Sequence, residues 1–102
     1  MQVGIEMLSK IPPENRREFI QSFKALPHYN GCLNNCVFHM LLEDVSDMNC
    51  FLWVEHWVDK QALEKYLQSD RFKTILGAID ALGELIHFNR IKVNNIQNLK
   101  KN

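Results

Sequence analysis

The two tryptophans of the chain, Trp53 and Trp57, flank Glu55 and His56 in the segment 51–57, which has the composition of a strand. Side chains of a strand alternate between its two faces, so Trp53, Glu55 and Trp57 should share one face while His56 points to the other. An indole ring can stack on a planar ligand and can donate one hydrogen bond. The segment therefore predicts the wall of a pocket for an aromatic compound, although core packing would explain the same tryptophans.

Glu55 would lie on an otherwise apolar strand face, where a charged group needs a partner. Arg16, Arg17 and Arg71 are the cations that could supply it. We therefore expect a structural ion pair between Glu55 and one of these arginines.

Three side chains are candidates for acid–base catalysis: Tyr66, His56 and His39. An imidazole, with an ordinary pKa of about 6.5, can accept a phenolic proton at neutral pH. His56 would need a β-bulge to face the same side as the tryptophans. Tyr66 could donate its phenol into a pocket from the helix that follows, but a surface tyrosine with its hydroxyl in water has the same pattern.

A metal site is a further possibility, because His28, Cys32, Cys36 and His39 bring two thiols and two imidazoles into a short span. If Cys36 and His39 lie on one regular strand, however, their side chains point to opposite faces and cannot share a tetrahedral ion. We therefore expect no metal. The glycines form no phosphate-binding motif.

Composition limits the partners and the compartment. The chain has 102 residues, of which 46% are hydrophobic and 24% charged, which suits one globular domain. Its 12 basic and 12 acidic residues give a net charge of zero, so we expect no nucleic acid and no anionic membrane surface as partner. No basic leader and no apolar run of about 20 residues is present, so we expect a cytoplasmic protein without a membrane span. Three cysteines, an odd number, favour free thiols.

Hydrophobic periodicity predicts four strands and two helices. The strands are expected at residues 3–8, 36–43, 50–57 and 85–93. The first helix should begin near Pro12 and Pro13 and end before Pro27, where a loop follows. The polar segment 43–49 should join two antiparallel strands through a loop longer than a two-residue turn.

Capping residues define the second helix. Asp59 can accept a hydrogen bond from a free amide of its first turn. Ser69 also has the features of a helix cap, although the apolar pattern of the helix continues after it. We therefore expect one long helix that bends near Ser69. It should stop at Gly83, which can adopt the left-handed conformation of a helix end.

The order β-α-β-β-α-β predicts an α+β, ferredoxin-like antiparallel sheet with two helices on one face. The second and third strands are apolar on both faces: Cys36, Phe38, Met40 and Leu42 against Val37 and Leu41, and Phe51, Trp53 and Trp57 against Leu52 and Val54. Two helices can cover only one face of such a sheet. We therefore expect a homodimer in which a second subunit covers the other face.

The run "VEHWVDKQALEKYLQSDRF" resembles the antibiotic biosynthesis monooxygenase (ABM) superfamily in its Glu-x-Trp strand end, its Ala-Leu helix and its Ser-x-x-Phe. The resemblance implies a dimeric α+β barrel formed by a domain at residues 1–93, with a polar tail at 94–102. It also implies a pocket in each subunit between sheet and helices. Some members oxidise phenolic polycycles or hydroquinones with dioxygen and no metal or flavin, while others degrade haem.

The chain departs from the family pattern at four helix positions. Tyr66 stands where many relatives have histidine, and Asp70 and Arg71 replace the proline and histidine of a frequent Ser-Pro-His-Phe. The haem-degrading branch has an iron-ligating histidine where this chain has Leu76. Leucine cannot ligate iron, so we expect no haem.

The resemblance implies a cofactor-independent, quinol-monooxygenase-like enzyme that acts on a small aromatic or quinol compound. The expected ligand-binding residues are Trp53, Trp57, Glu55 and Phe72, and the expected catalytic groups are Tyr66, His56 and His39. A non-catalytic dimer that binds a small molecule in the same pocket is the alternative. A module whose apolar sheet serves only assembly is a third.

Overall fold

The structure is a computed structural model that describes residues 1–25 and 35–93. The predicted loop from Pro27, with His28 and Cys32, and the predicted tail at 94–102 lie outside the described residues. None of the described helices is both long enough and apolar enough to cross a membrane.

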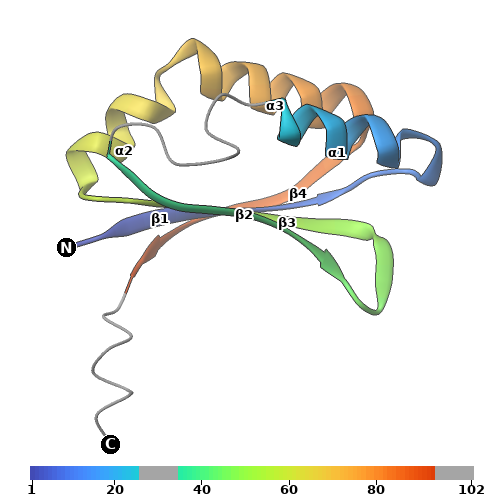
Figure 1. Cartoon of the computed structure of the whole chain (residues 1–102), viewed down its shortest axis with the longest axis horizontal. Coiled ribbons are helices and arrows are strands. Elements are labelled where there is room, and N and C mark those ends of the chain that lie inside the picture. Colours follow the sequence, from blue (N-terminus) through green and yellow to red (C-terminus); the bar gives the residue numbers. More distant parts are fainter. Residues whose placement is uncertain (26–34, 94–102) are drawn as a thin grey trace, which may run out of the picture.

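Four strands form one antiparallel sheet in the order β2-β3-β1-β4. The three α-helices of the described residues lie on one face of this sheet (Figure 1). The elements are β1 (Val3–Lys10), the 3₁₀ helix η1 (Pro13–Asn15), α1 (Arg16–Lys24), β2 (Cys36–Asp44), β3 (Asp47–Trp57), α2 (Lys60–Leu67), α3 (Asp70–Leu82) and β4 (Glu84–Lys92). The architecture confirms the predicted α+β, ferredoxin-like fold.

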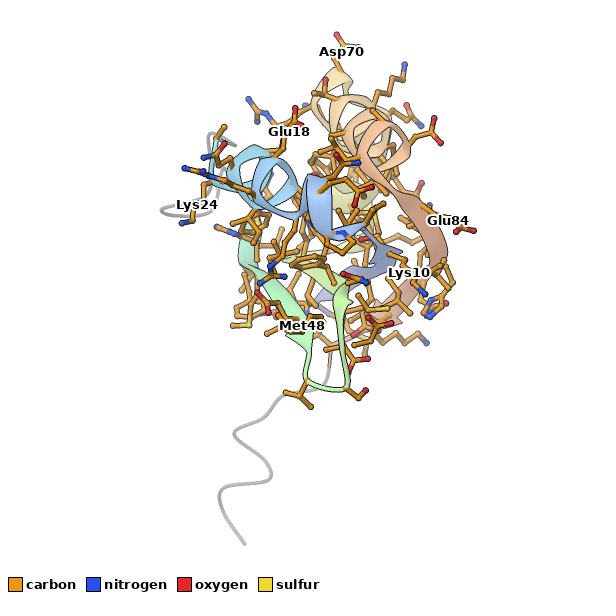
Figure 2. The ribbon with its side chains drawn as sticks, turned by 90° about the vertical axis from the view of Figure 1, so that its right-hand side faces the viewer. Lys10, Glu18, Lys24, Met48, Asp70 and Glu84 are labelled. Carbon is orange, nitrogen blue, oxygen red and sulfur yellow. The ribbon has the colours of Figure 1, made fainter. Side chains whose placement is uncertain are left out.

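The core lies between the helices and the helix-facing side of the sheet. Ile5 and Met7 of β1 are fully buried there, as their alternation with polar residues predicted. Helix α1 contributes Phe19 and Phe23, and α3 contributes residues that include Ile79. Figure 2, which views the molecule from the side, shows side chains filling the layer between helices and sheet.

The predicted long helix is two helices. Both predicted caps are confirmed: an Asp59 side-chain oxygen accepts from the Ala62 amide at 2.8 Å, and the Ser69 hydroxyl accepts from the Phe72 amide at 3.2 Å. Ser69, however, has an extended backbone with ψ of 155°, which ends the helical path and starts a new helix. The prediction of one bent helix was therefore wrong, because a capping residue in extended conformation breaks the helix.

The hairpin between β2 and β3 is also tighter than predicted. Asp44 pairs with Asp47, so only Val45 and Ser46 form the turn. A carboxylate oxygen of Asp44 accepts from the Ser46 amide at 2.9 Å and from its hydroxyl at 2.7 Å. The expectation of a longer loop was wrong because this side chain closes the turn, while the polar residues after it belong to β3.

Gly83 ends α3, but not in the predicted left-handed conformation. Its φ is −169°, an extended backbone that any residue can adopt. A Cβ atom at this position would collide with the carbonyl oxygen of Lys10. Close approach of two backbone segments, and not handedness, therefore explains the glycine.

A β-bulge in β2 changes which side chains face the helices. Cys36 lies opposite Trp57, but Phe38 lies opposite His56 and the register shifts between them. The extra residue brings His39 opposite Glu55, so Cys36 and His39 both face the helices. The prediction that these two side chains point to opposite faces was wrong, because it assumed a regular strand. Among the described residues, no group of three or more possible ligands could hold a metal ion.

Several apolar side chains lie on the sheet face away from the described helices, which Figure 1 shows below the sheet. Its residues, placed by the strand registers, include Leu8 of β1, Phe38, Met40 and Leu42 of β2, and Leu52 and Val54 of β3. Met40 and Leu42 are 39% and 42% exposed. We call these six residues the outer apolar face.

Two glycine substitutions test the packing of the sheet, at Gly4 in β1, and the helix propensity of α3, at Gly77. A Cβ at Gly4 would lie 2.5 Å from the backbone oxygen of Glu55, whereas nothing lies within 4 Å of one at Gly77. Gly4→Ala should lower the free energy of unfolding by about 1–3 kcal/mol, the cost of overpacking. Gly77→Ala, within α3, should raise it by about 0.5–1 kcal/mol through helix propensity.

Urea unfolding followed by circular dichroism would measure both changes. Equal stability of the Gly4→Ala variant and the parent would contradict the close packing of β1 against β3.

Candidate active site

Glu55 is the centre of a buried hydrogen-bond network. The residue is 0% exposed and lies on β3 among apolar side chains. One carboxylate oxygen accepts from Trp53 Nε1 at 2.8 Å and from the Tyr66 hydroxyl at 2.9 Å, and the other accepts from Trp57 Nε1 at 3.1 Å. We call these four residues the Glu55 network. Its geometry follows from period-two alternation on β3, which aims both indoles and the carboxylate at the helices.

These donors differ from the predicted arginine partners. Arg16 instead binds the carboxylate of Glu43 and the backbone carbonyl of Met48. Neutral donors can stabilise a buried carboxylate because each N–H or O–H points a partial positive charge at it.

Tyr66 is buried and keeps its proton. The cap at Asp59 starts α2 so that Tyr66 lies over Trp57, with ring centroids 4.4 Å apart and planes 28° from parallel. Burial, reinforced by the Glu55 carboxylate, raises the pKa of Tyr66 far above its ordinary value. The phenol is therefore a hydrogen-bond donor at physiological pH and not a base. Phe72 packs against its ring at 5.4 Å.

A cleft of about 580 Å³ opens beside this network, between α1 and α3. Trp53 is the member of the Glu55 network that lines it. The remaining lining residues are the apolar Phe19, Ala25, Ile75, Ala78 and Ile79 and the polar Ser22, Asp70, Arg71 and Thr74. We call this space the Trp53 cleft.

A second cleft of about 410 Å³ lies between α1 and β2 and is lined by residues that include His39, Phe23 and Phe51. The Phe23 ring lies 5.9 Å from the His39 ring and meets Trp53 edge to face at 4.5 Å. Phe23 therefore contacts both the imidazole and the indole. The bulge in β2 is what places His39 on this side of the sheet.

His56 lies on the opposite face of the sheet from Trp53. It packs against Phe38 with ring centroids 5.0 Å apart, and it faces Gly4 across the strand pair. Burial lowers the pKa of His56, and the nearby Glu6 carboxylate partly opposes this shift. The alternation of β3 thus holds His56 away from both clefts.

The predicted site residues therefore fall into four places, one of which is the opposite face of the sheet, where His56 lies. Trp53 lines the large cleft, and His39 lines the small one. The buried cluster behind Trp53 contains Glu55, Trp57, Tyr66 and Phe72. Sequence reasoning did not find Ser22 and Thr74, because a polar residue on an amphipathic helix gives the same signal whether it faces solvent or a cleft.

Comparisons with known proteins agree with this architecture. The family model described as antibiotic biosynthesis monooxygenase (ABM) matches residues 3–78. YcnE of Bacillus subtilis (strain 168), a candidate monooxygenase, is 24% identical over 71 residues, which cover 70% of this chain and 75% of YcnE.

Two solved structures illustrate the shared fold. A conserved protein from Methanosarcina mazei Go1 superposes with a TM-score of 0.79 at 19% identity, covering 92% of this chain and 94% of that one. SnoaB, a cofactor-independent oxygenase from Streptomyces nogalater, superposes with a TM-score of 0.66 at 17% identity, covering 92% of this chain and 94% of SnoaB.

Replacing the central carboxylate tests the network. In Glu55→Gln, one oxygen becomes an NH₂ group that must face an indole N–H or the Tyr66 hydroxyl, so a buried donor loses its acceptor. We expect the free energy of unfolding to fall by about 1–3 kcal/mol. Urea unfolding monitored by tryptophan fluorescence would measure the change.

Glu64→Gln is the matched control, because Glu64 forms an exposed ion pair with Arg90. Such pairs contribute about 0–1 kcal/mol. A Glu55→Gln variant no less stable than Glu64→Gln would contradict the network.

Proposed function

Because the chain belongs to the antibiotic biosynthesis monooxygenase family, we propose that it is a cofactor-independent monooxygenase that oxidises a small aromatic or quinol compound bound in the Trp53 cleft. The observation that carries the proposal is the fixed indole of Trp53 beside an apolar space. Its N–H is held by Glu55 at 2.8 Å, which sets the orientation of the ring. A flat ring held in place can stack on a planar ligand without losing further conformational freedom.

The size and lining of the Trp53 cleft suit such a ligand. Its volume of about 580 Å³ is within the range of small-molecule sites, which is roughly 300–1,000 Å³. Phe19, Ile75 and Ile79 supply apolar walls that exclude water from the reacting ring.

Cofactor-free oxygenation needs a base that forms the electron-rich anion of the substrate. Dioxygen then takes up the electrons, one oxygen atom entering the product and the other leaving as water. Tyr66 is a donor committed to Glu55, and His56 lies on the opposite face of the sheet. We assign the role of base to His39, which lines the second cleft and contacts the Phe23 ring that also contacts Trp53, so that it would take the proton through a water molecule between the two clefts.

Oxygen uptake with a panel of dihydroquinones tests the function. The parent should consume dioxygen, and His39→Gln should lower kcat by about 100-fold, the scale of general-base catalysis. His87→Gln is the control, because His87 is an exposed histidine of β4. His56→Gln should also retain kcat if the base is His39.

Three outcomes separate the alternatives. Saturable quenching of tryptophan fluorescence without oxygen uptake would assign the chain to non-catalytic binders. Loss of kcat in His56→Gln but not in His39→Gln would transfer the role of base. Failure of every quinol and phenol to quench would reject the Trp53 cleft as the binding site.

The outer apolar face supports a second part of the proposal, a homodimer formed through the sheet. Members of this family are commonly dimers. Met40 and Leu42 expose apolar surface next to the nearly buried Val54 on a face that no described helix covers. Burying this surface against a second copy would remove it from water.

Light scattering should therefore give about twice the chain mass of 12.0 kDa. Met40→Lys should shift the protein to monomer, because a charge would be buried in the interface. Val45→Lys is the matched control: Val45 is fully exposed at the hairpin tip, so the same change there should leave the dimer intact. A parent protein that stays monomeric at micromolar concentration would contradict the proposal.

A further inference from the structure

We propose that the ligand of the Trp53 cleft is an aromatic carboxylate that carries hydroxyl groups, and that Arg71 binds its carboxylate at the rim. This inference rests on the proposed function, since it names the class of compound that the same cleft takes. Arg71 lines the cleft together with Trp53. A guanidinium binds a carboxylate through two parallel hydrogen bonds.

Arg71 is available for a ligand. Within residues 1–25 and 35–93, no carboxylate forms an ion pair with its guanidinium, whereas Arg16 is paired with Glu43 and Arg90 with Glu64. Asp70, its neighbour on α3, also lies at the rim of the cleft. Figure 2 shows Asp70 at the outer end of the molecule, and the ion pairs found among the described residues do not include one between Asp70 and Arg71.

The two hydroxyl groups in the lining are already used as donors. Ser22 Oγ donates to the backbone carbonyl of Glu18 at 2.9 Å, and Thr74 Oγ1 donates to that of Asp70 at 2.9 Å. Each hydroxyl proton is therefore directed at its own helix, while the oxygen lone pairs remain able to accept. Among the described side chains that line the cleft, Arg71 is then the donor available for an anion, and Ser22 and Thr74 suit a hydroxyl of the ligand.

The positive charge of Arg71 also reaches the inner end of the site. It partly opposes the rise in the pKa of Tyr66. A ligand with its ring on Trp53 and its carboxylate at Arg71 would contact two residues that line the same cleft.

Matched ligands test the inference by quenching of tryptophan fluorescence at pH 7. Gentisate is a hydroquinone with a carboxylate, its methyl ester lacks the charge, and hydroquinone lacks the group altogether. Gentisate should bind the parent about tenfold more tightly than the ester, the scale of a hydrogen bond to a charged group. Arg71→Gln should remove this preference and leave the affinity for the ester unchanged.

Lys73→Gln is the matched control, because Lys73 is an exposed cation on the same helix that does not line the cleft. It should keep the preference for gentisate, and Arg71→Lys should restore part of it. Equal binding of gentisate and its ester to the parent would overturn this inference and leave the proposed function standing. An Arg71→Gln variant that still prefers gentisate to its methyl ester would also overturn the inference and leave the proposed function standing. If neither compound nor hydroquinone quenches, the inference and the Trp53 cleft fail together.

Discussion

The structure on the helix side of the sheet depends on one constraint, the complete burial of the Glu55 carboxylate. Removing a charged group from water costs several kcal/mol unless hydrogen bonds compensate. Three of them come from Trp53, Trp57 and Tyr66. Because these donors belong to both β3 and α2, satisfying Glu55 also fixes how α2 lies on the sheet. The same bond from Trp53 sets the plane of the indole, so the wall of the cleft follows from the burial of a charge.

The two faces of the sheet differ in their surroundings, and a single extra residue in β2 decides on which face His39 lies. Without the bulge next to Val37, Cys36 and Phe38 would share a face, and His39 would point away from Glu55. With it, Phe38 joins the outer apolar face while His39 borders a cleft beneath α1. The proposed division between an assembly face and a ligand face therefore depends on this local irregularity.

Much of the fold and the composition of the Glu55 network could be predicted from the sequence, because they depend on local periodicity. Alternation over 51–57 predicted that Glu55 lies between the indoles and that His56 lies on the other face, and capping chemistry predicted both helix starts.

The bulge at Val37 could not be predicted, because no glycine or other local signal marks it. The donors to Glu55 were missed because the sequence shows which arginines are present but not how far they lie from Glu55. The expectation of an ion pair therefore took precedence over neutral donors on the same strand and on the next helix. Ser22 and Thr74 become cleft residues only through the packing of α1 against α3.

The charges around the Trp53 cleft also determine how an anionic ligand would be oriented. Both oxygens of Glu55 accept hydrogen bonds, one of them from the indole N–H of Trp53. A ligand carboxylate placed over the indole would lie near the oxygen atoms of Glu55, which repel other carboxylate oxygens. At the rim it would meet the guanidinium of Arg71 instead. Repulsion from Glu55 and attraction to Arg71 act in the same direction, so both favour a ring that lies inward on Trp53 and a carboxylate that points out of the cleft.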